Sequence, residues 1–128
     1  MDAPKEIHEM KEDLEFAAKF FEGVIKFSPN YVEAMIPLAE AYTRKGDYQK
    51  GLEVDKKLAG LCKNDPVVHY NLACSYALLG EKEKALEVLD KAVGLGYSDA
   101  VQMKKDPDLQ SLREEPEFLQ LLRRIDPS

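Results

Sequence analysis

Apolar residues recur along this chain at steps of three and four positions, the spacing that places side chains on one face of an α-helix. Proline, glycine, asparagine and aspartate separate these runs, as they do at helix ends. The pattern predicts long helices over residues 4–27, 31–45, 48–63, 66–79 and 81–95. Shorter helical pieces are expected over 99–105, from Asp106 and from Glu115 to about 125. No strand is predicted, so the expected fold class is all-α.

Two of these helix pairs are near-copies of each other at an offset of 34 residues. The nine shared positions are Leu38, Ala39, Tyr42, Gly46, Leu52, Glu53, Val54, Lys57 and Leu61 in one copy and Leu72, Ala73, Tyr76, Gly80, Leu86, Glu87, Val88, Lys91 and Leu95 in the other. Each copy is expected to be a helix, a turn at the shared glycine and a second helix. This period is typical of arrays in which neighbouring helix pairs stack and share a core.

The repeated positions resemble the tetratricopeptide repeat. Its first half is matched by Met35, Leu38, Ala39 and Tyr42 and again by His69, Leu72, Ala73 and Tyr76. Its second half is matched by Ala17, Phe21 and Pro29 in the first helix, by Gly51 in the middle copy, and by Ala85 and Leu89 in the last. Asp55 stands where the family has an aromatic residue, and the expected proline comes late, at Pro66, which predicts a lengthened helix over 48–63.

The resemblance extends from about residue 12 to 97 and implies one domain over residues 1–128. It would comprise a half repeat at 4–29, repeats at 31–65 and 66–97, and a helical cap at 98–128. The implied architecture is a short right-handed α-solenoid of stacked antiparallel helix-turn-helix repeats with a helical C-terminal cap. The implied function is that of a non-catalytic adaptor that binds a peptide or helix of a partner protein in a concave groove.

Family groove positions, carried over residue by residue, fall on the first helix of each repeat. They are Glu33, Pro37, Glu40, Thr43 and Arg44 in one repeat and Val67, Tyr70, Asn71, Cys74, Ala77 and Leu78 in the other. Tyr70 and Asn71 are the expected gripping residues, since an aromatic ring supplies area and an amide pairs with a peptide backbone. A basic or apolar segment is the expected partner. The alternative is that the first helix or the cap covers these positions.

The first long helix has apolar residues around about half of its circumference. A second surface, for pairing with another copy or with a partner helix, is therefore expected at Ile7, Met10, Leu14, Phe16, Phe20 and Phe27. A self-assembling, homodimeric scaffold is the alternative function. Equally open is that residues before Leu14 fold back, or that the cap curls round, to cover this surface.

Charge narrows the choice of partners. A third of the 128 residues are charged and the formal net charge is -6, a balance that repels phosphate backbones and anionic lipid headgroups. We expect neither nucleic acid nor a membrane as partner. The first residues lack a basic start followed by an apolar run, so a cytoplasmic protein is expected.

Candidate chemistry is sparse. Cys62 and Cys74 are expected to be free thiols, because helix stacking explains stability without a disulfide. Their spacing to each other and to His69 does not provide the short ligand steps of a zinc site, and His69 is expected to pack in the interior. We expect no metal, no cofactor and no catalytic residue, which leaves a small enzyme as a distant third reading.

Overall fold

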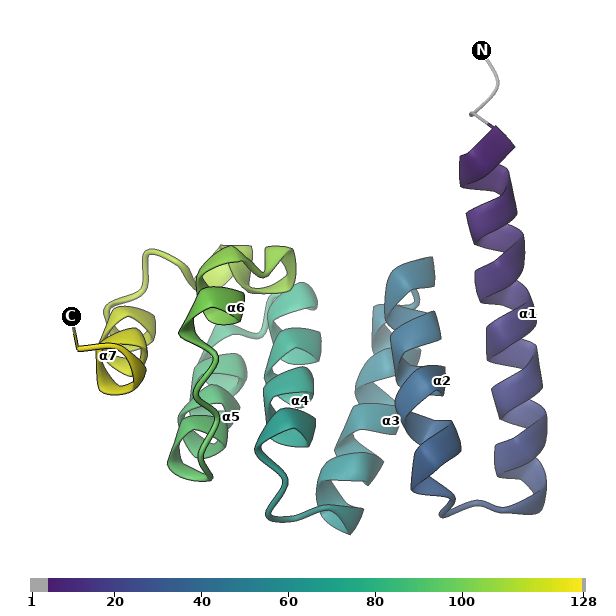
Figure 1. Ribbon diagram of the computed structural model, residues 1–128, viewed down its shortest axis with the longest axis horizontal. Coiled ribbons are helices and arrows are strands. Elements are labelled where there is room, and N and C mark those ends of the chain that lie inside the picture. Colours follow the sequence, from purple (N-terminus) through teal and green to yellow (C-terminus); the bar gives the residue numbers. More distant parts are fainter. Residues whose placement is uncertain (1–4, 128) are drawn as a thin grey trace. The chain divides into compact units, whose positions relative to one another are not determined.

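The computed structural model describes the backbone of residues 5–127 and the side chains of residues 9–127 (Figure 1). All regular structure in this range is helical, as the sequence predicts, and within each repeat the two helices pack against each other antiparallel. The helices are α1 (Lys5–Phe27), α2 (Val32–Lys45), α3 (Tyr48–Leu61), α4 (Pro66–Leu78), α5 (Lys82–Gly94), α6 (Ala100–Lys105), the 3-10 helix η1 (Pro107–Leu112) and α7 (Pro116–Ile125). Within this described range, no helix combines the length and the apolar character needed to span a bilayer.

The two repeats have the same turn, bond for bond. Gly46 and Gly80 have φ angles of 89° and 77°, in the left-handed region that favours glycine. In the first turn the Asp47 amide donates to the carbonyl of Tyr42 at 2.9 Å, and 34 residues later the Glu81 amide donates to Tyr76 at 3.0 Å. Both turns follow the Schellman pattern that ends helices at glycine. The predicted repeat and its glycine stops are confirmed.

The chain divides into two compact units, Met1–Leu61 and Cys62–Ser128. In the first unit α2 packs against both α1 and α3. Its core joins Ala18 of α1 to Leu38, Ala41 and Tyr42 of α2, with Val54 of α3 packed beside them. The Tyr42 hydroxyl also donates to a Glu22 carboxylate oxygen of α1 at 2.5 Å. The apolar stripe predicted for α2 is therefore buried. That residues 1–128 form one domain stays a prediction.

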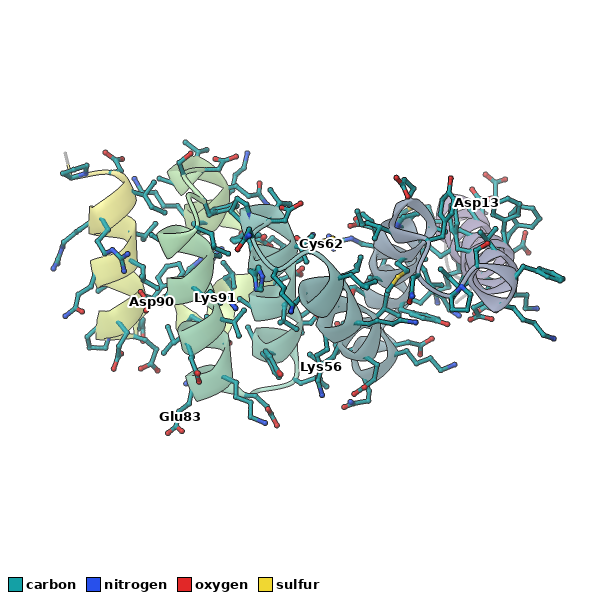
Figure 2. The ribbon with its side chains drawn as sticks, turned by 90° about the horizontal axis from the view of Figure 1, so that it is seen from below. Asp13, Lys56, Cys62, Glu83, Asp90 and Lys91 are labelled. Carbon is teal, nitrogen blue, oxygen red and sulfur yellow. The ribbon has the colours of Figure 1, made fainter. Side chains whose placement is uncertain are left out.

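The second unit consists of the last repeat and the segment after it. The α4–α5 hairpin packs against η1 and α7, and α6 packs against α7. Residues from the C-terminal segment supply much of its core, including Met103, Leu109, Leu112, Phe118 and Leu121. Figure 2 shows charged side chains such as Lys56 of α3 and Glu83 of α5 projecting from the outer sides of their helices.

One helix end differs from the prediction. α3 ends at Leu61, not at residue 63, because a tight turn begins there: the Asp65 amide donates to the carbonyl of Cys62 at 3.2 Å. The Lys63 carbonyl lies 3.0 Å from the His69 ring nitrogen Nε2. The interior position predicted for His69 is confirmed. Leu61 lies one turn after Leu58, a spacing that predicts an inward side chain, but its side chain is exposed and that prediction is wrong.

Candidate interaction surfaces

Three of the six groove positions of α4 are covered by the chain's own C-terminal segment. Tyr70 is only 4% exposed, and Cys74 and Ala77 are also buried. The ring of Tyr70 stacks on the ring of Tyr97, with centroids 4.1 Å apart and planes within 3°. The side chain of Tyr70 is therefore not exposed as the predicted gripping role requires, because Tyr97 and the C-terminal segment pack over it.

The buried carboxylate of Asp106 links the C-terminal segment to α4 by hydrogen bonds. Asp106 Oδ2 accepts hydrogen bonds from the Tyr70 hydroxyl at 2.7 Å and from the side-chain amide nitrogen Nε2 of Gln102 at 3.1 Å. The Cys74 thiol lies 3.8 Å from the same oxygen. The other oxygen, Oδ1, accepts from the Asp108 backbone amide at 3.0 Å and so caps the start of η1. Asp106 thus joins α4, α6 and η1 through one side chain.

Burial governs the titration of the stacked tyrosines. Desolvation is the main cause that raises the pKa of Tyr97 to about 12. Desolvation also raises the pKa of Tyr70, with further contributions from Cys74 and Asp106. Both phenols therefore stay protonated at neutral pH, and Tyr70 acts as a hydrogen-bond donor within the core.

Three groups around Asp106 have the atom types of a metal site. The ligand atoms of Cys74, Asp106 and Asp108 lie within 4.8 Å of one another. The Asp106 oxygens, however, already accept hydrogen bonds from Tyr70, Gln102 and the Asp108 amide. Those hydrogen bonds explain why a carboxylate is buried here: Asp106 caps η1 and binds Tyr70 and Gln102. Neither Cys62 nor Cys74 forms a disulfide bond, as predicted.

The remaining groove positions are more open. On α4, Val67 and Asn71 are exposed and Leu78 is half-buried. On α2, Glu33, Glu40 and Arg44 are exposed, while Pro37 and Thr43 are half-buried. Arg44 and Glu40 form an ion pair at 3.3 Å, one turn apart.

Sequence reasoning missed one exposed residue of α2. Ile36 stands 34 residues before Tyr70, at the same place in the repeat, yet it is 44% exposed where Tyr70 is 4% exposed. Neighbouring Glu40 corresponds in the same way to buried Cys74. The repeat offset from Tyr70 identifies Ile36 from the sequence alone. These two repeat positions are thus buried on α4, at Tyr70 and Cys74, and exposed on α2, at Ile36 and Glu40.

The aromatic surface of α1 is exposed as expected at three phenylalanines. Phe16, Phe20 and Phe27 are 73%, 56% and 88% exposed, and Met10 is exposed as well. Leu14 is half-buried, and the side chain of Ile7 lies outside the described residues. The other side of α1, at Ala17, Ala18, Phe21 and Ile25, packs against the core of the first unit. Whether the exposed surface binds another molecule stays a prediction.

Comparisons with known proteins agree with this fold. Residues 67–95 match the family described as tetratricopeptide repeat. A chloroplastic protein of Arabidopsis thaliana is 34% identical over 91 residues, which cover 68% of this chain and 27% of that protein. A crystal structure of MamA has a TM-score of 0.74 at 23% identity and covers 99% of this chain and 77% of its own. A second crystal structure of MamA protein has a TM-score of 0.73 at 24% identity, with coverage of 95% and 69%.

Proposed function

Because the chain is a tetratricopeptide-repeat protein, we propose that it is a non-catalytic adaptor that binds a segment of a partner protein on the open face of α2. That face carries Glu33, Ile36, Glu40 and Arg44, all exposed, with Pro37 and Thr43 half-buried beside them. Repeat proteins of this kind offer such first-helix surfaces to extended or helical segments.

The contrast between Ile36 and Tyr70 carries this proposal. The chain covers the apolar residue at this position in its last repeat and leaves the equivalent isoleucine 44% exposed on α2. An exposed branched apolar side chain between two carboxylates suits a partner segment with an apolar residue flanked by basic ones. Of the residues expected to grip a ligand, Asn71 stays exposed on α4 and belongs to the proposal as a secondary contact.

Partner capture with matched variants of the full chain tests the assignment. Ile36→Lys and Glu40→Lys should each reduce recovery of a specific partner, because the first removes the apolar contact and the second reverses a charge. Glu53→Lys makes the same charge change on α3, where the carboxylate is exposed, and should leave recovery unchanged. Equal recovery by all three variants would remove α2 from the interface.

A self-assembling scaffold is the second candidate, and the exposure of Phe16 and Phe20 favours it. Burying one phenylalanine contributes roughly 1.5–3 kcal/mol, and a symmetric dimer would bury both phenylalanines of each copy. Sedimentation of the pure chain over a range of concentrations tests it. A dimer that Phe16→Glu and Phe20→Glu dissociate would support the scaffold, and a monomer at every concentration would contradict it.

A further inference from the structure

At the 34-residue offset, α1 occupies the position of the second helix of a repeat. Among the described residues, those that would form the first helix of that repeat do not fold back against α1 as a separate helix. Ala17 and Phe21 of α1 correspond to Gly51 and Asp55 of α3. The turn glycine of the complete repeats, Gly46, corresponds to Glu12. With glutamate in that place the left-handed turn is lost, and the backbone from Lys5 to Phe27 forms one uninterrupted helix. Within residues 5–127, α1 packs against α2, the first helix of the following repeat, and no helix occupies the place of a first helix of its own.

The complete repeats show which side of a second helix its first helix covers. In α3, Val54 packs against the cluster that contains Leu38 and Tyr42 of α2. Lys50, one turn earlier, places its Nζ 5.6 Å from the centre of the Tyr42 ring. The second repeat has the same pair, with Lys84 Nζ 5.8 Å from the ring of Tyr76. These positions therefore define the side that faces the first helix.

On α1 the equivalent positions hold phenylalanines. Phe16 corresponds to Lys50 and Phe20 to Val54, and they are 73% and 56% exposed. Their rings stack with centroids 6.4 Å apart, and the Phe20 ring meets Phe21 edge-on at 5.2 Å. Lys11, Glu12, Glu15 and Lys19 line a shallow hollow beside Phe16. The side that contacts a first helix in the complete repeats, through half-buried Val54 and exposed Lys50 in α3, is here an uncovered aromatic surface.

We propose that this surface binds an amphipathic helix of another protein, which lies antiparallel to α1 and occupies the place of the first helix. The occupant follows the pattern that α2 presents to α3, with leucine, a small residue and an aromatic residue at the spacing of Leu38, Ala39 and Tyr42. A small residue also marks the point of closest approach: a Cβ on Gly51 would lie 2.8 Å from Thr43 Oγ1, and the equivalent residue of α1 is Ala17.

A second copy of this chain fits the surface less well than a foreign helix. Its first helices, α2 and α4, already bury the leucine and the small residue of this pattern, Leu38 and Ala39 in α2 and Leu72 and Ala73 in α4. The α1 helix of a second copy has instead a row of exposed phenylalanines, and Ile36 and Val67 are single exposed apolar residues on their helices. The inference concerns α1 and is independent of the α2 surface proposed above.

A stapled, fluorescently labelled helical peptide with the sequence of residues 31–46, titrated into the full chain by fluorescence anisotropy, tests the proposal. Phe16→Glu should weaken binding about tenfold or more, as for a central aromatic contact. Lys50→Glu introduces the same charge at the equivalent position of a hairpin that is already complete, so binding should be unchanged. A peptide of scrambled sequence should not bind.

Hydrogen exchange localises the complex. The bound peptide should protect amides of α1 around Phe16 and Phe20, and the Ile36→Lys variant should bind it normally, which separates this site from the α2 surface. Absence of binding, or equal binding by wild type and Phe16→Glu, would overturn the proposal. So would a dimer of the pure chain that Phe16→Glu dissociates and that excludes the peptide, because the occupant would then be a second copy.

Discussion

The hydroxyl of Tyr70 donates a hydrogen bond of 2.7 Å to the buried carboxylate of Asp106, 36 residues further along the chain. This bond links the first helix of the last repeat to the start of η1. Together with the stacking of Tyr70 on Tyr97, it makes a residue from a family groove position part of the interior. The consequences for Tyr70 are structural and can be measured as stability.

Tyr70→Ala should destabilise the chain by about 3–5 kcal/mol, the range for removing a large aromatic side chain from a core. Tyr70→Phe keeps the ring and removes only the hydroxyl, so the loss should be about 1–2 kcal/mol. Urea unfolding followed by circular dichroism measures both. Asn71→Ala, at the exposed next position, is the control and should change stability by less than about 0.5 kcal/mol. Tyr70→Ala as stable as that control would contradict the buried assignment.

Asp106→Ala should cost about 2–4 kcal/mol, because it removes a helix cap and leaves the buried Tyr70 hydroxyl without its acceptor. Asp99→Ala provides the comparison. Asp99 caps α6 through the Gln102 amide at 2.9 Å but is exposed, so its loss should cost about 1 kcal/mol. Equal losses for the two variants would show that Asp106 does no more than cap a helix.

Stability should fall at alkaline pH. The unfolded tyrosines lose their protons near pH 10, whereas folded Tyr97 keeps its proton up to about pH 12 and Tyr70 keeps its proton as well. Between these values the unfolded chain binds fewer protons than the folded chain, so the free energy of unfolding decreases as pH rises. Below pH 10 the contribution of both groups is fully present. Unfolding curves from pH 8 to 12, at roughly unit steps, measure this slope, and Tyr97→Phe should reduce it. A flat profile above pH 10 would contradict the burial of both rings.

Gly46→Ala and Gly80→Ala should each cost about 1–2 kcal/mol, because both turns need a left-handed residue. The two variants should be similar, since the surrounding hydrogen bonds recur at the same positions. Gly60→Ala in α3 is the control. A Cβ there meets open space inside a helix, so the change should be neutral or stabilise by up to about 1 kcal/mol. A neutral Gly80→Ala would show that the turn relaxes without the left-handed residue.

Local chemistry explains what the sequence predicted well. The turns at Gly46 and Gly80, the helix starts near Pro66 and Asp99 and the buried stripe of α2 depend on neighbours a few positions away, which the sequence displays directly. The end expected for α3 near residue 63 was wrong by two residues, because that expectation followed the late proline at Pro66 whereas the chain already turns at Cys62.

Long-range contacts explain what it did not predict. The repeat pattern identifies which side of α4 holds Tyr70, but not that η1 packs over that side. The run Asp106-Pro107-Asp108 indicated a helix start, and nothing in it indicated that the capping carboxylate would also accept the Tyr70 hydroxyl. Ile36 occupies the same repeat position as Tyr70, but the sequence does not show that this position is uncovered on α2 and covered on α4.

The C-terminal segment that covers α4 also limits how this protein could be lengthened. Asp106, Leu109 and Leu112 fit the surface of the repeat that ends at Leu95, so any additional hairpin appended between that repeat and its tail would separate residues that now interlock. A further repeat would therefore have to be inserted before Pro66. The α4–α5 hairpin and the segment after it would then stay together at the C-terminal end.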